Sequence, residues 1–116
     1  MALLHDAPEY VIGDLISPFK VAIGIDYKAL ENRLQAAIHV RFGLPPQPAA
    51  SLITLFKRAD LLAAYFEATQ LAGFEEKEAR RFFNLPPAGM KTPRLVPLET
   101  SAAQAQFLER FRRLAA

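Results

Sequence analysis

The chain has 116 residues, of which 52% are hydrophobic and 22% charged, a composition that predicts one globular domain with a real core. Its net charge of +2 is too small to predict a nucleic-acid partner, because a phosphate-binding face needs a local cluster of Lys and Arg. It contains no cysteine, so disulfides and thiolate catalysis are excluded and any metal must be held by nitrogen and oxygen.

The first half of the chain predicts the end of one helix, a loop and a long helix. Residues 2–9 are expected to form the last turns of a buried helix, because the segment opens on apolar residues with no polar face. Residues 10–24 contain recurring Gly and Pro and predict a loop with room for one short helical turn. Asp26 is a good N-cap for a helix that runs to about Phe42 and is stopped by Gly43. The expected inward stripe of this helix is Leu30, Leu34, Ile38 and Phe42.

The second half predicts three further helices. A long helix is expected from about residue 48 to 72, stopped by Gly73, and a shorter charged helix over 75–84. Residues 86–97 are rich in Pro and Gly and predict an extended connector before a final helix over about 99–114. The apolar residues that this helix is expected to bury are Phe107, Leu108, Phe111 and Leu114. Strand-like alternation is missing, so the predicted fold class is all-α, with residues 1–116 forming a single domain.

Neither a membrane span nor an export signal is predicted. No stretch approaches the roughly 20 consecutive apolar residues that cross a bilayer. The N-terminus lacks the basic, apolar and small-residue order of a signal peptide. We therefore expect a cytoplasmic protein without a membrane partner.

Residues able to bind a metal or move a proton gather near the N-terminus. His5 and Asp6 are adjacent, and their different lengths let both reach one ion. On a helix, Glu9 lies one turn further along the same face, close enough to act on a metal-bound water without being a ligand. Asp14 follows in the loop. Charges are costly to bury unless they are paired or coordinate a metal, so this group indicates a site.

A further carboxylate, Asp60, lies in the second long helix. The apolar stripe of that helix passes beside it, so Asp60 is expected on or at the edge of the buried face. A buried carboxylate needs compensation, which a metal ion or a basic neighbour such as Lys57 or Arg58 would supply.

These segments resemble a known family. LLHDAPEYVIGDLISPFK is similar to the second motif of HD-domain metal-dependent phosphohydrolases, and FKRADLLAAYFEA resembles the later helix that carries the last aspartate ligand of that family. The nearest branch by resemblance is the bacterial HD-type 5'-deoxynucleotidases, in which HDxxE leads into GDL-x-[ST]-P-x-K and a helix resembling DYKALENRLQ. The similarity covers roughly residues 2–75 and implies an HD-like helical bundle.

The resemblance also implies roles for individual residues. Three of them would be metal ligands, namely His5, Asp6 and Asp60. Glu9 would act on the attacking water or the leaving group, and Asp14 would contact the substrate or orient the site. The nucleotide pocket would be lined by Ser17, Pro18, Phe19 and Lys20, with Lys20 as the phosphate contact. The implied cofactor is a divalent ion (Mn, Co, Ni, Fe, Zn or Mg), and the implied substrate is a nucleotide or related phosphomonoester.

One departure from the family pattern is plain. The family takes its first metal ligand from a histidine upstream of the His-Asp pair, and this sequence has no residue there, so we expect an HD-like domain that lacks its N-terminal part. The only other histidine, His39, lies near the end of a helix, where a cationic imidazole is favoured, and is expected to be a surface or capping residue.

Structural alternatives stay open for several of these residues. His5 is also consistent with a hydrogen-bonded buried histidine, Asp6 with a cap of the following loop, and Asp14 with a turn closure. Lys20 is also consistent with an ordinary exposed lysine, and Glu31 is expected on a solvated helix face. A second function remains as well, a non-catalytic HD-like helical module that covers its exposed apolar surface by forming a homodimer.

Overall fold

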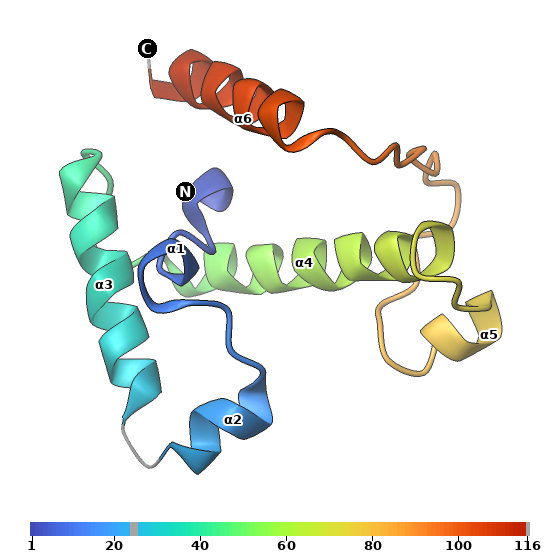
Figure 1. Ribbon diagram of the computed structural model, residues 1–116, viewed down its shortest axis with the longest axis horizontal. Helices are drawn as coiled ribbons and strands as arrows, with labels where there is room; N and C mark the ends of the chain where they lie inside the picture. Colours follow the sequence, from blue (N-terminus) through green and yellow to red (C-terminus); the bar gives the residue numbers. More distant parts are fainter. Residues whose placement is uncertain (24–25, 116) are drawn as a thin grey trace. The chain divides into compact units, whose positions relative to one another are not determined.

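The computed structural model describes residues 1–23 and 26–115, in which every regular element is a helix (Figure 1). The elements are η1 (Ala2–Leu4), α1 (Glu9–Ile12), α2 (Ser17–Ala22), α3 (Tyr27–Arg41), α4 (Ala50–Gln70), α5 (Glu76–Ala79) and α6 (Thr100–Ala115). No strand occurs in these two ranges, which confirms the all-α prediction. Contacts between residues group the chain into two compact units, Met1–Phe56 and Lys57–Ala116. Gly24, predicted as a break, lies outside the described residues.

The start of the first unit winds helically, but not as the α-helix expected over residues 2–9. The N–H of His5 donates to the carbonyl of Ala2 (3.1 Å), and that of Glu9 donates to Asp6 (3.0 Å), both across three residues. Pro8 explains the difference, because it has no N–H with which to continue an α-helical ladder. It stands instead as the N-cap of α1, so the chain forms two short helices, η1 and α1, in place of one.

The boundaries of α3 follow the sequence prediction. The Asp26 side chain accepts a hydrogen bond from the N–H of Ala29 (3.0 Å), as an N-cap does. After the last turn, Gly43 has a φ of +69°, and the N–H of Leu44 returns to the carbonyl of His39 (2.8 Å). A left-handed residue followed by a backward hydrogen bond ends a helix, and glycine adopts that φ without steric cost.

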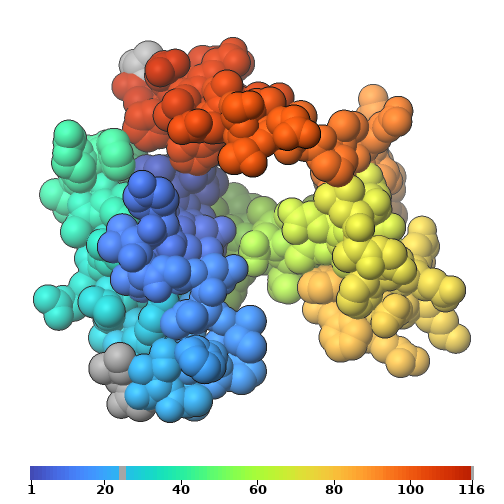
Figure 2. All heavy atoms as spheres, in the orientation of Figure 1, coloured from blue at the N-terminus to red at the C-terminus, as the bar shows by residue number. Residues whose placement is uncertain are grey.

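The inward face of α3 is displaced from the predicted stripe. Leu30 and Phe42 are exposed, whereas Tyr27 and His39 are buried. The partly buried residues between these two are Glu31, Leu34, Gln35, Ala36 and Ile38. In the space-filling view, atoms of residues 1–23 (blue) lie directly against those of α3 (cyan to green) (Figure 2). The face that meets the N-terminal segment therefore carries polar groups beside apolar ones.

In the second unit, the core forms around the end of α4. Tyr65, Phe66 and Ala68 are buried together with Ala79 of α5. Leu62, Phe74, Phe83 and Leu95 pack against them. The extended connector is fixed to this core by Gln70, whose amide donates to the carbonyl of Pro93 and accepts from the N–H of Leu95, both at 2.9 Å. Gly73, with a φ of +76°, ends the helix as predicted.

Two expectations for the rest of the second unit are wrong. The helix predicted over 75–84 is only the four residues of α5, because the chain turns at Arg80. The final helix is present as α6, but Phe107, Leu108 and Leu114 are exposed and Phe111 is partly buried. Amphipathic periodicity identifies a helix without specifying which surface covers its apolar face. Within the described ranges, no helix is long and apolar enough to cross a membrane.

Candidate functional site

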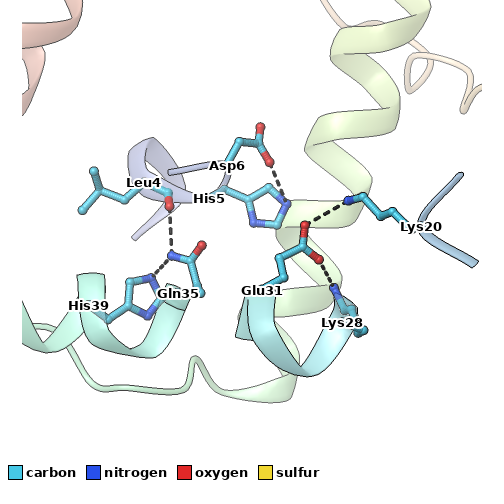
Figure 3. Close-up of polar contacts among 8 residues, drawn as sticks. All are labelled: Leu4, His5, Asp6, Lys20, Lys28, Glu31, Gln35 and His39. Carbon is cyan, nitrogen blue, oxygen red and sulfur yellow. Dashed lines mark hydrogen bonds and ion pairs between the residues drawn. The ribbon is translucent and has the colours of Figure 1, made fainter. Parts of the chain in front are cut away.

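His5 and Asp6 stand side by side at the end of η1, with their side chains open to solvent. The His5 Nε2 atom lies 3.8 Å from Asp6 Oδ1, and the two side chains are 44% and 66% exposed (Figure 3). The imidazole packs against the ring of Phe56, with 5.8 Å between ring centroids. At 3.8 Å the two groups do not hydrogen-bond, so the imidazole nitrogen and the carboxylate oxygen each remain available to bind a ligand. The alternative of a hydrogen-bonded buried histidine at position 5 is therefore wrong.

Glu9 opens α1 in a half-buried position close to other acids. Burial raises the pKa of its carboxyl above the usual value, and the negative charges of Asp14 and Asp6 raise it further, while Lys20 lowers it. The helical turn from Asp6 to Glu9 brings the carboxylates of these two residues close to each other. A carboxyl whose pKa moves toward neutrality is suited to exchange a proton with a substrate or with water.

Asp14 follows the glycine that ends α1. Gly13 has a φ of +83°, in the region that other residues rarely adopt. The hydroxyl of Tyr27, a buried residue of α3, donates to the Gly13 carbonyl (3.2 Å) and so fixes the turn. The Asp14 side chain itself is exposed. The turn therefore presents this carboxylate to solvent while its backbone is held from behind.

The residues matched to the nucleotide pocket form a helix, α2, with Pro18 in its first turn. Ser17, Pro18 and Phe19 are exposed, whereas Lys20 turns toward α3. α2 packs against α3 through this lysine, whose Nζ donates to Glu31 Oε1 at 2.9 Å (Figure 3).

Glu31 accepts hydrogen bonds from two lysines. Its second oxygen accepts from Lys28 Nζ at 3.1 Å, one turn away on α3. Burial of Glu31 raises the pKa of its carboxyl, but hydrogen bonds from Lys20 and Lys28 outweigh that effect and the net pKa is lowered. The side chains of Lys20 and Glu31 are 25% and 15% exposed. The expectation that Glu31 lies on a solvated face is therefore wrong.

His39 is the most deeply buried polar residue of the described chain, at 2% exposure, so its assignment as a surface or capping residue is also wrong. The Gln35 amide donates to His39 Nε2 (2.8 Å) and to the Leu4 carbonyl (2.9 Å) (Figure 3). His39 Nδ1 then faces the Pro46 carbonyl at 3.4 Å, which favours the tautomer with its proton on Nδ1. This network joins α3 to the peptide just before His5. The i, i+4 spacing of Gln35 and His39 was the signal in the sequence.

No family model matches the chain. The chain is 55% identical over 85 residues to an uncharacterized protein of Rhodobacter capsulatus, an alignment that covers 73% of this chain and 43% of that protein. It is 32% identical over 110 residues to the uncharacterized protein YfdR of Escherichia coli K12, covering 95% of this chain and 58% of YfdR. The chain thus spans about half the length of the curated relatives it matches.

The candidate residues divide between the two units. All of those from His5 to Lys20 belong to the first unit, whereas Asp60 belongs to the second, on α4. The Asp60 side chain is exposed, so the expectation that it lies at the edge of a buried face is wrong. The first half of α4 is largely solvent-exposed, and burial begins only near Tyr65.

The donor set for a metal ion is small. Across residues 1–23 and 26–115, no three His, Asp or Glu side chains are grouped so that they could hold one ion. His5 and Asp6 supply two donors, whereas a zinc ion takes four ligands and a magnesium ion six. These residues as arranged do not fit a complete metal centre.

Proposed function

We propose that this chain carries the acid–base and phosphate-binding side chains of an HD-type phosphohydrolase, closest to the HD-type 5'-deoxynucleotidases, that acts on nucleotides or related phosphomonoesters in the cytoplasm. The observation that carries the proposal is the setting of Glu9. Its carboxyl is half-buried, its pKa is raised by burial and by Asp14 and Asp6, and Lys20 is close enough to oppose that rise. A proton-exchanging carboxyl and a nearby cation can both serve the hydrolysis of a phosphomonoester.

In the proposed reaction, water attacks phosphorus and the ester oxygen leaves. Glu9 exchanges the proton, taking it from the water or giving it to the leaving oxygen. Lys20 acts as a point charge on the phosphoryl oxygens. Asp14, exposed at the Gly13 turn, contacts or orients the substrate, and Phe19, exposed on α2, offers a surface for the base.

The family resemblance implies a divalent ion as cofactor, and of its implied donors the first unit holds His5 and Asp6. Such an ion, when bound, lowers the pKa of its water and neutralises phosphoryl charge. Because the described residues group only two of these donors, the roles given to Glu9 and Lys20 do not depend on it.

The test is phosphate release from 5'-deoxynucleoside monophosphates with Mn, Co, Ni, Fe, Zn or Mg ions added in turn. We expect Glu9→Gln to lower the rate by about 10²-fold or more, because it removes proton exchange while keeping the shape of the side chain. Glu67→Gln, on an exposed position of α4, is the matched control and should leave the rate unchanged. Wild-type release that Glu9→Gln does not reduce, or no release with any of the six ions, would contradict the proposal.

A second function is supported by a different observation, the exposed apolar side chains of the first unit. Tyr10 is 95% exposed, and the others between residues 11 and 23 are Val11, Ile16, Phe19, Val21 and Ile23. Large apolar side chains left exposed along one segment can form an interface. The chain would then be a non-catalytic HD-like helical module stabilised as a homodimer. Sedimentation velocity at micromolar concentration tests this function, and a monomer would contradict it.

A further inference from the structure

The ammonium group of Lys20 is held by two side chains of α3. Its Nζ lies 2.9 Å from Glu31 Oε1 and 5.2 Å from the centroid of the Tyr27 ring. Tyr27 is buried, and its hydroxyl is fixed on the Gly13 carbonyl. The other oxygen of the carboxylate accepts from Lys28, whose side chain is 75% exposed and therefore restrains Glu31 only weakly. A lysine stem has four rotatable bonds, and these contacts restrict where its charge can lie.

Holding Lys20 in this way does not use up its hydrogen-bonding capacity. A lysine ammonium has three N–H donors, and Glu31 takes one of them. The side chain remains 25% exposed, so part of it is accessible from solvent. The hydrogen bond to Glu31 also raises the pKa of Lys20, which keeps the group charged.

We propose that Glu31 is a positioning residue that holds the ammonium group of Lys20 in place for a phosphate group of the substrate. This inference rests on the proposed function, in which Lys20 is the phosphate contact. Glu31 would not itself touch the substrate. Its effect would come from fixing Lys20 before binding, so that little side-chain entropy is lost when the phosphate arrives.

If Glu31 instead competed with phosphate for Lys20, its removal would change phosphate affinity in the opposite direction. Removing the carboxylate would then free the lysine and tighten phosphate binding. A purely structural ion pair would change stability and leave binding alone, and partly exposed pairs contribute little to stability. The direction of the change in affinity therefore separates the three roles.

The experiment measures binding of deoxyadenosine 5'-monophosphate and of inorganic phosphate by titration calorimetry. We expect Glu31→Ala to weaken both affinities about tenfold and Glu31→Gln, which keeps an acceptor oxygen, to weaken them about threefold. Lys28→Ala is the matched control, because Lys28 contacts the same carboxylate but is 75% exposed, and should change the affinities less than twofold. Circular dichroism checks that each variant is folded.

The double variant Lys20→Ala with Glu31→Ala separates positioning from general damage to the fold. If Glu31 acts through Lys20, the double variant should bind no more weakly than Lys20→Ala alone. A further loss in the double variant, or equal or tighter binding by Glu31→Ala, overturns the positioning role while the proposed function stands. Wild-type protein that binds neither the nucleotide nor phosphate overturns the proposed function, and this inference with it.

Discussion

The buried pair of Gln35 and His39 allows a sharp prediction about stability. Gln35→Ala removes hydrogen bonds of 2.9 Å to the Leu4 carbonyl and 2.8 Å to His39 Nε2. The His39 ring is only 2% exposed, so water cannot replace the lost donor without opening the structure. His39 Nε2, left unsatisfied, costs about 1–3 kcal/mol, and the Leu4 carbonyl, which still accepts from the N–H of Ala7, loses one hydrogen bond of about 1 kcal/mol, so we expect the free energy of unfolding to fall by about 2–4 kcal/mol. That is a large share of the roughly 5–15 kcal/mol by which domains are stable.

The assay is urea unfolding followed by circular dichroism, with amide hydrogen exchange along α3 to show that the loss arises in the first unit. Arg33→Ala, at an exposed position of the same helix, is the control. Gln35→Met keeps the length of the side chain and should still be destabilised, because the lost term is polar. If Gln35→Ala lowered stability no more than Arg33→Ala does, within about 0.5 kcal/mol, the network would contribute nothing and the reasoning would be refuted.

Two further predictions concern the first unit. Asp26→Ala should lower the unfolding free energy by about 1 kcal/mol in urea unfolding, because the N-cap of α3 is lost; an unchanged midpoint would contradict this. The other concerns pH and two glutamates whose pKa values move in opposite directions. Because the pKa of Glu9 is raised in the folded state, Glu9 contributes stability below its unfolded pKa and loses that contribution as pH rises through its folded pKa. Glu9→Gln should therefore raise Tm at about pH 7 and change it little at about pH 3.5. Glu31 has a lowered folded pKa, so its contribution is lost as pH falls, and Glu31→Gln should lower Tm at about pH 7 by more than at about pH 3.5; shifts of the same sign at neutral pH would show that the two environments are misassigned.

The parts of the fold that were predictable from the sequence depend on local chemistry. Asp26 caps α3 because its side chain reaches an N–H three residues away, and Gly43 and Gly73 end helices because their φ is positive. All three effects act within a few residues, so the local sequence contains them. The break in the first helix is local too, since Pro8 was visible in the sequence and its missing N–H accounts for the change to η1 and α1.

Burial was less predictable, because it depends on segments far apart in the sequence. His39 is buried through Gln35, which hydrogen-bonds the Leu4 carbonyl 31 residues away, and apolar periodicity does not encode that partner. Leu30 was expected inside for its apolar character and is exposed instead. In the candidate site, too, contacts within one segment were predictable and contacts between distant segments were not. The spacing of Asp6 and Glu9 predicts that they share one helical turn, but nothing local predicts that Lys20 meets Glu31.

The meeting of Lys20 and Glu31 has a consequence for Glu9, the proposed proton-exchanging group. Lys20 lowers the pKa of Glu9, whereas the charge of Glu31 raises it. Because Glu31 hydrogen-bonds Lys20 directly, its negative charge stands beside the cation and offsets part of the field that Lys20 exerts on Glu9. A lysine without this partner would favour the ionised form of Glu9 more strongly. One carboxylate on α3 can therefore fix the proposed phosphate-binding cation and, at the same time, contribute to the raised pKa of Glu9.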